Sequence, residues 1–123
     1  MNLESLLNKF EIKKGDKIIV TSNIVKILIK FKNRKIDFDP NILIDALIKK
    51  IGKNGTLLIP TFNWDFCKGK TFKYHKTPSQ SGALGNIALR RKDFLRSFNP
   101  IYSFAVTGKD KKKNLHIKTR RLF

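Results

Sequence analysis

A short segment in the second half of the chain combines small polar, apolar and basic residues in an order that suits anion binding. Ser79, Ser81 and Gly82 precede an apolar run at helical spacing, and small residues of this kind are typical of a helix N-terminus. The free N–H groups at a helix N-terminus can hold an anion. Arg90 and Arg91 follow and add positive charge. The pattern predicts a ligand site around this helix.

A turn and a strand follow the predicted helix and complete the segment from Thr77 to Gly108. Asn99-Pro100 interrupts the chain, because a residue before proline disfavours helical backbone. Residues 103–106 are apolar apart from the initial serine and are predicted to form a short strand that ends at Gly108. The whole segment is therefore predicted to be the centre of the binding site.

The elements that must position this site alternate between helical and extended patterns. Asp39 is a suitable helix cap, Pro40 suits the first helical turn, and Gly52 is a typical helix stop. Apolar spacing predicts helices over residues 3–10, 24–31 and 40–51 and strands over residues 17–20 and 56–61.

This order predicts an α/β fold of three layers, helix/sheet/helix, with a mostly parallel central sheet. The strands over 17–20 and 56–61 are expected to be parallel neighbours. Ligands gather at the carboxyl ends of such strands, where Ser22 and Thr61 lie. For Ser22, the role of helix cap is favoured over that of ligand contact.

Residues 62–76 show no regular period, and aromatic side chains alternate there with lysines. Three interpretations stay open. The favoured one is that the rings pack on the domain and the lysines are solvated. The second is a substrate loop in which Asp65 faces a cationic amine, and the third is stacking of nucleic-acid bases on the rings.

Four linked motifs resemble the antibiotic acetyltransferases, the aminoglycoside 3-N-acetyltransferase-like enzymes. Their order along the chain matches that family, although Asn99 and Tyr102 stand where the family has histidines. The motifs are Thr21-Ser22-Asn23, Ile59-Pro60-Thr61-Phe62, Gly82-Ala83-Leu84 with Arg90-Arg91, and the run from Arg96-Ser97 to Ser103.

The resemblance implies an acetyl-CoA-dependent N-acetyltransferase that acts on an amino group of an aminoglycoside. Acetylation of an amino sugar in surface polysaccharide is the alternative substrate class, and a basic nucleic-acid-binding module is the alternative of another kind. Asp65 is the expected substrate contact. The family's catalytic histidine and acidic residue are expected beyond the end of this chain. The expected acetyl-CoA contacts are Ser22, Thr61, Ser81, Gly82, Ala83, Leu84, Arg90 and Ser103.

Composition narrows the possible partners. The 123 residues carry a formal net charge of +18, which suggests polyanions, but the basic residues are spread along the chain and a solvated lysine surface is favoured over specific nucleic-acid binding. Cys67 is the single cysteine, so a reducing, cytoplasmic location is expected. The sequence shows no signal-peptide pattern, no membrane-spanning run and no metal-ligand motif.

Two segments are predicted. Residues 1–108 form the N-terminal part of an acetyltransferase domain, and residues 109–123 form a basic, irregular tail. The resemblance implies that members of the family are roughly twice as long as this chain. The chain is therefore expected to be a truncated form that is inactive by itself, and a frameshift near Lys118 is the hypothesis for its ending. Self-association through an incomplete sheet is a further expectation.

Overall fold

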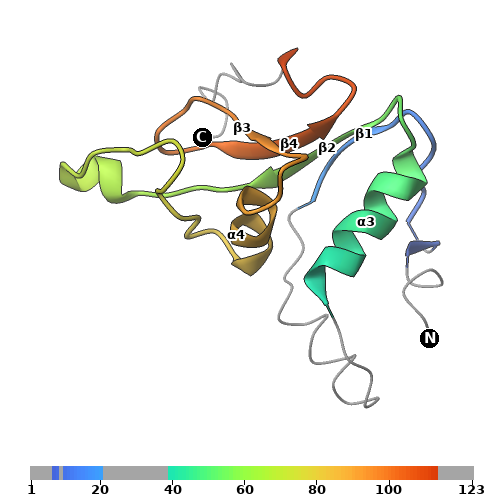
Figure 1. Cartoon of the computed structure of the whole chain (residues 1–123), viewed down its shortest axis with the longest axis horizontal. Coiled ribbons are helices and arrows are strands. Elements are labelled where there is room, and N and C mark those ends of the chain that lie inside the picture. Colours follow the sequence, from blue (N-terminus) through green and yellow to red (C-terminus); the bar gives the residue numbers. More distant parts are fainter. Residues whose placement is uncertain (1–6, 9, 21–38, 114–123) are drawn as a thin grey trace.

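The computed structural model describes residues 7–8, 10–20 and 39–113 (Figure 1). Within these ranges the helices and strands are β1 (Lys17–Ile19), α3 (Pro40–Ile51), β2 (Thr56–Pro60), the 3-10 helix η1 (Asp65–Lys68), α4 (Ala83–Leu89), β3 (Leu95–Arg96) and β4 (Phe104–Gly108). The strands predicted near residues 17, 56 and 103 and the helices predicted near residues 40 and 83 are confirmed. The sequence patterns did not predict η1 or β3.

The strands form one four-stranded sheet in the order β1-β2-β4-β3. The α/β class is confirmed, and β1 and β2 are parallel neighbours as predicted. The prediction of a mostly parallel sheet is wrong for the described strands, because β4 runs antiparallel to both β2 and β3. Only residues 97–103 connect β3 to β4, and so short a connection permits an antiparallel pair but not a parallel crossover.

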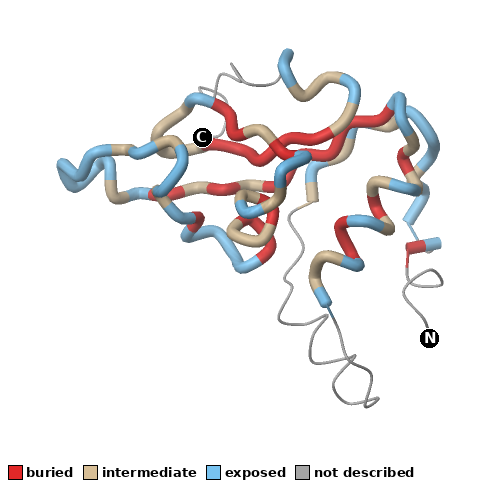
Figure 2. The backbone as a smooth tube through the Cα atoms, viewed as in Figure 1, coloured by how far each residue is buried: buried red, intermediate tan, exposed pale blue. Residues whose placement is uncertain are grey.

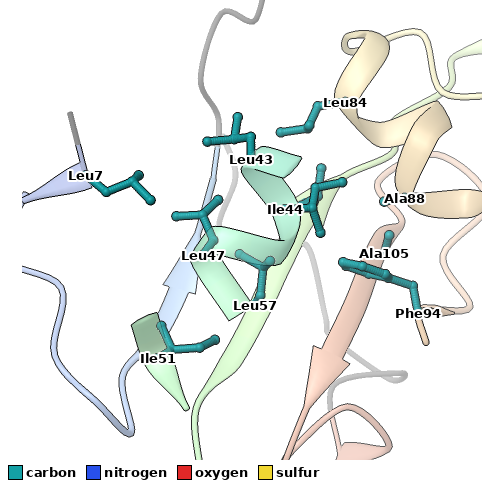
Figure 3. Packing of buried hydrophobic residues seen from close by; sticks show 11 residues of the cluster. Leu7, Leu43, Ile44, Leu47, Ile51, Leu57, Leu84, Ala88, Phe94 and Ala105 are labelled. Carbon is teal, nitrogen blue, oxygen red and sulfur yellow. The ribbon is translucent and has the colours of Figure 1, made fainter. Parts of the chain in front are cut away.

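Helices α3 and α4 cover the same face of the sheet (Figure 1). The sheet residues Leu57 and Ala105 point to that face and pack with side chains from both helices (Figure 3), and Ile59 belongs to the same cluster. Leu58 and Val106 are buried on the opposite face in a separate cluster. The predicted helix over 24–31, which would help to form a third layer, lies outside the described residues, so the third layer stays a prediction.

Burial is concentrated where the two helices meet the central strands (Figure 2). Helix α3 contributes Leu43, Ile44, Leu47 and Ile51 from one side. Leu7 also packs in this cluster, whereas most of the predicted helix over residues 3–10 lies outside the described ranges.

The predicted ends of α3 are confirmed in detail. The Asp39 side chain accepts a hydrogen bond from the backbone N–H of Asn41 at 2.9 Å. At the other end Gly52 adopts a φ of 70°, a left-handed value that a side chain would disfavour, and its N–H donates to the carbonyl of Ile48. This well-capped helix lays its apolar side on the sheet that carries the site.

The first residues after β4 remain attached to the start of β2. The N–H of Lys109 donates to the carbonyl of Gly55 at 3.0 Å, and the N–H of Asp110 donates to the Thr56 hydroxyl at 3.1 Å. The predicted division after Gly108 stays a prediction. None of the described helices has the length and apolar character that a membrane span requires.

Candidate functional site

Two buried hydroxyl groups meet at the end of the sheet where β2 stops and β4 begins. Thr61 directly follows β2, Ser103 directly precedes β4, and their hydroxyl oxygens lie 2.7 Å apart. The Ser103 hydroxyl also lies 2.9 Å from the Thr61 carbonyl oxygen, to which it can donate. The antiparallel register brings these residues together, since Pro60 is opposite Phe104.

Arg96 is the charged centre of this cluster and is only 4% exposed. Its Nε–H donates to the Ser103 hydroxyl at 2.9 Å, and Nη2 donates to the Thr61 carbonyl at 3.3 Å. Nη1 donates to the carbonyls of Thr77 and, at 3.4 Å, Tyr74. One guanidinium group therefore joins β3, both strand ends and the loop before α4.

The surroundings of Arg96 are neutral. Tyr74 donates its hydroxyl proton to the Arg96 carbonyl at 2.5 Å, and the Phe72 ring centroid lies 4.8 Å from the guanidinium carbon. No described carboxylate contacts the guanidinium. Because burial disfavours the charged form, the pKa of Arg96 is lowered from its ordinary value.

The serines before α4 join this helix to the end of β2. The Ser81 hydroxyl donates to the Pro60 carbonyl at 3.2 Å and accepts from the N–H of Phe62 at 3.1 Å. The hydroxyls of Ser79 and Ser81 are 3.1 Å apart. The side chain of Asn86 then bonds both the N–H and the carbonyl of Ser79, at 2.7 and 3.0 Å. The loop is thus tied to its own helix and to the strand.

The predicted helix entry is partly open to solvent. Gly82 and Ala83 are exposed, whereas Leu84 is buried in the main core cluster. No side chain caps the N-terminus of α4. Helix α4 also lies very close to β2, because a Cβ atom on Gly85 would be 2.6 Å from the Pro60 carbonyl oxygen. Only glycine fits at that position without a shift.

The two consecutive arginines after α4 have different environments. Arg91 forms ion pairs with Asp45 of α3 at 2.6 Å and with Asp93 at 2.9 Å. The hydrogen bond from Arg91 lowers the pKa of Asp93, since it stabilises the carboxylate. Arg90 is exposed and has no hydrogen bond or ion pair from its side chain to a described residue. Arg91 therefore has a structural role in ion pairs, whereas the exposed Arg90 side chain has no such partner among the described residues.

Arg90 and Arg96 line the same pocket, whose volume is about 430 Å³. The pocket lies between the loop before α4, helix α4 itself and the segment that leads into β3. Its lining residues are Tyr74, His75, Lys76, Thr77, Pro78, Asn86, Leu89, Arg90, Phe94, Leu95 and Arg96. It contains basic side chains and no carboxylate.

Asp65, the predicted substrate contact, lies on the loop after β2. Its carboxylate accepts a hydrogen bond from the Gln80 side chain at 3.2 Å. Phe62 on the same loop packs against Phe104, with ring centroids 5.2 Å apart, as the favoured interpretation of this loop predicted. Trp64 differs from that interpretation, because it is 40% exposed.

The structure therefore brings some of the predicted contacts together but not all. Thr61 and Ser103 touch each other and lie at 0% and 1% exposure, so their hydroxyls serve the protein's own hydrogen bonds. Ser81 lies beside the same strand end. Ser22 lies outside the described residues. The sequence analysis did not predict the structural roles of Ser79, Asn86 and Arg96. Arg96 was part of the Arg96-Ser97 motif, but the motif assigned no function to its side chain.

No described histidine contacts a carboxylate. His75 is exposed and packs edge-on against Tyr74, with ring centroids 4.8 Å apart. In the described ranges there is also no cluster of three side chains suited to a metal ion. The described part of the chain therefore offers a binding surface without a histidine–carboxylate pair for proton transfer.

Solved structures with a similar arrangement of helices and strands identify the fold of the chain. YokD protein from Bacillus subtilis superimposes with a TM-score of 0.75 at 22% identity. The aminoglycoside acetyltransferase AAC(3)-IVa apoenzyme gives 0.74 at 22% identity, and AAC-IIIb in its binary structure with CoASH gives 0.73 at 18%. The chain has the α/β fold of these proteins.

The family follows from the sequence itself. The family model described as aminoglycoside 3-N-acetyltransferase matches residues 31–119, and the chain belongs to this family. Among curated proteins none matches the chain. The structural superpositions on YokD, AAC(3)-IVa and AAC-IIIb cover 92%, 95% and 93% of this chain. They cover 51%, 42% and 47% of those three chains. The chain thus spans about half the length of the solved structures that it matches.

Proposed function

We propose that the chain binds acetyl-CoA and supplies this binding site for N-acetylation of an aminoglycoside. The family match over residues 31–119 carries the proposal, because it includes every described segment that lines the site. The AAC-IIIb structure with CoASH supports the choice of cofactor, since that protein has the same fold. Acetyl-CoA would act as a co-substrate.

The reaction sets three requirements. The amine nitrogen attacks the thioester carbonyl, the C–S bond breaks, the thiolate of CoA leaves, and a base takes the proton from the amine. Donors must also stabilise the oxyanion that forms during attack. We assign to this chain the task of holding the thioester. The open edge at Ser81, Gly82 and Ala83 would contact it, and the buried pair Thr61 and Ser103 would keep that edge in place.

We assign proton transfer to groups other than the described residues of this chain. The described residues hold no histidine–carboxylate pair, and Asp65 is engaged with Gln80. We therefore propose that acetylation requires groups that the described residues do not provide, and that binding of acetyl-CoA is the activity to test. Asp65, which lies on an exposed loop, is the proposed contact for a cationic amine of the sugar.

The direct test is calorimetric titration of the chain with acetyl-CoA and CoA, with Ala83→Glu as the site variant. The new carboxylate lies in the first turn of α4, where acidic residues are compatible with the helix, yet it would repel the anionic cofactor and fill the open edge. Ile42→Glu is the matched control, because Ile42 is 54% exposed in the first turn of α3.

We expect saturable binding that Ala83→Glu weakens at least tenfold and Ile42→Glu leaves within twofold. Absence of saturable binding by a chain that melts cooperatively would refute the proposal. A thiol-release assay with aminoglycosides and with simple amino sugars then identifies the acceptor. Turnover of the amino sugar alone would assign the chain to polysaccharide amino-sugar acetylation instead.

A further inference from the structure

Two large aromatic side chains are exposed on the loop that follows β2. Trp64 is 40% exposed, and Phe66 in η1 is 49% exposed. Trp64 packs edge-on against Phe62, with ring centroids 6.4 Å apart, and Phe62 packs edge-on against Tyr102 at 5.2 Å. We call these four residues the aromatic surface. Figure 1 shows η1 at the end of the structure opposite α3, away from the core cluster under the helices.

Hydrogen bonds within the chain hold this loop in place. The backbone N–H of Trp64 donates to the Gln80 side chain at 2.9 Å. The buried Asn63 side chain donates to the Pro78 carbonyl and accepts from the N–H of Asp65, both at 2.8 Å. A partner that meets a loop already ordered in this way loses little further conformational entropy. Tryptophan is also enriched among the residues that contribute most to binding between proteins.

The charge around the aromatic surface is positive. Between residues 62 and 76 Asp65 is the only carboxylate, and Gln80 is its described side-chain partner. The lysines of this segment are exposed and form no ion pair with a described residue, and they are Lys68, Lys70, Lys73 and Lys76. A second copy of the chain would bring more positive charge, because each copy carries +18. An acidic partner is therefore complementary to this loop.

The aromatic surface adjoins the groups that we assign to acetyl transfer. The N–H of Phe62 donates to the Ser81 hydroxyl at 3.1 Å. The described residues hold no histidine–carboxylate pair for proton transfer, and a polypeptide can supply such a pair whereas a nucleic acid or a lipid cannot. The chain also spans about half the length of the solved structures that it matches, so in those proteins about as much polypeptide again accompanies this fold.

We propose that the aromatic surface docks an acidic polypeptide, which brings proton-transfer groups next to the edge at Ser81. The inference rests on the proposed function for the role of this partner, while the docking chemistry follows from the exposed rings and lysines. Apolar side chains of the partner would cover Trp64 and Phe66, and its carboxylates would meet the surrounding lysines. An apolar centre within a polar rim is the usual arrangement at protein interfaces.

The probe is a displayed library of random peptides, which is selected on the unchanged chain. Enriched peptides are synthesised with a fluorescent label, and anisotropy gives their affinity. Trp64 is the only tryptophan of the chain, so its emission reports whether a peptide contacts the aromatic surface. The surface variant is Trp64→Ala with Phe66→Ala. The matched control is Ile19→Ala with Ile42→Ala, because both isoleucines are exposed and lie outside the aromatic surface.

We expect the enriched peptides to combine Asp or Glu with apolar residues and to shift the emission of Trp64 to shorter wavelength. The surface variant should bind them at least tenfold more weakly, and the control should stay within twofold. Thermal melts verify folding, and Phe66→Ala alone replaces the double variant if that variant does not fold. The inference is overturned if no peptide is enriched, if the enriched peptides are not acidic, or if both variants bind them equally.

Two further probes test the other classes of partner. Polyuridylate and phosphatidylglycerol vesicles are titrated at physiological salt, and either one would overturn the inference if it displaced the peptides and shifted the emission of Trp64. Self-association of the unchanged chain that the surface variant loses would assign the surface to a second copy instead.

Titration of the same sample with acetyl-CoA separates the two proposals. If the chain binds acetyl-CoA but enriches no peptide, the docking inference fails and the proposed function stands. If acidic peptides bind at Trp64 but acetyl-CoA does not bind, the docking surface stands and the proposed function fails.

Discussion

Replacing Arg96 with lysine separates the geometry of the guanidinium from its charge. The guanidinium donates to the hydroxyl of Ser103 and to the carbonyls of Thr61, Thr77 and Tyr74. These acceptors lie in different segments, and the planar fork reaches all of them. Lysine keeps the positive charge but concentrates its donors on one atom. Arg96→Lys is therefore expected to destabilise the fold although it is chemically conservative.

The size of the effect follows from which acceptors lose their donor. Thr61 and Ser103 remain bonded to each other, so neither is left without a partner. The partly buried Thr77 carbonyl has no other described donor, and loss of its hydrogen bond costs about 1–3 kcal/mol at most, because solvent can reach part of this site. Loss of the contact with the Phe72 ring adds about 0.5–1 kcal/mol. The contacts to the other acceptors are weakened as well. We therefore expect Arg96→Lys to lower the free energy of unfolding by about 2–4 kcal/mol.

Urea unfolding followed by far-ultraviolet circular dichroism measures this loss, with Arg90→Lys as the control. Arg90 undergoes the same chemical change but has no described hydrogen bond from its side chain, so its variant is expected to stay within about 0.5 kcal/mol of the unchanged chain. If Arg96→Lys also stays within about 0.5 kcal/mol, charge alone maintains the cluster and the argument from the guanidinium fork is refuted.

Three further changes test the core and the helix contacts, each by thermal or urea unfolding. Gly85→Ala is expected to cost about 1–3 kcal/mol, because overpacking against the end of β2 outweighs the better helix propensity of alanine; a stabilised variant would contradict this. Ile44→Val should cost about 0.5–1.5 kcal/mol, whereas Ile42→Val on the exposed side should cost close to nothing. Asp93→Asn tests the pH dependence: the pKa of Asp93 is lowered in the fold, so its contribution exists above the ordinary aspartate range and disappears as pH falls through the folded value. The melting temperatures of the unchanged chain and this variant should therefore differ at pH 7 and converge as the pH falls below the ordinary aspartate range, and a constant difference would contradict the role of its bond to Arg91.

Local signals in the sequence predicted the elements that position the site. Asp39-Pro40 and Gly52 marked both ends of α3, and the apolar run before Pro60 marked β2, because caps and buried strands leave short, recognisable patterns. The motif order also predicted the family, which the match over residues 31–119 confirms. These features depend on neighbours in the chain, so a single sequence contains them.

The features that depend on long-range pairing were not predictable in the same way. Strand β3 is Leu95–Arg96, too short to show alternation, and its pairing with β4 makes that part of the sheet antiparallel. The burial of Arg96 also depends on contacts with distant segments. From the sequence alone, an arginine before a serine is expected to be exposed. Arg96 is buried only because the ends of β2 and β4 and the loop at Thr77 pack against it in the folded chain.

The two structural arginines show how neutral and charged partners produce different sites. Arg91 is held by two carboxylates, so its positive charge is cancelled where α3 meets the end of α4. Arg96 is held by neutral oxygens, which fix the guanidinium in place and leave its charge in the pocket wall. A carboxylate beside Arg96 would stabilise that cation but would also repel an anionic ligand. Among the described residues no carboxylate compensates the charge of Arg96 in the pocket wall, whereas two ion pairs compensate the charge of Arg91.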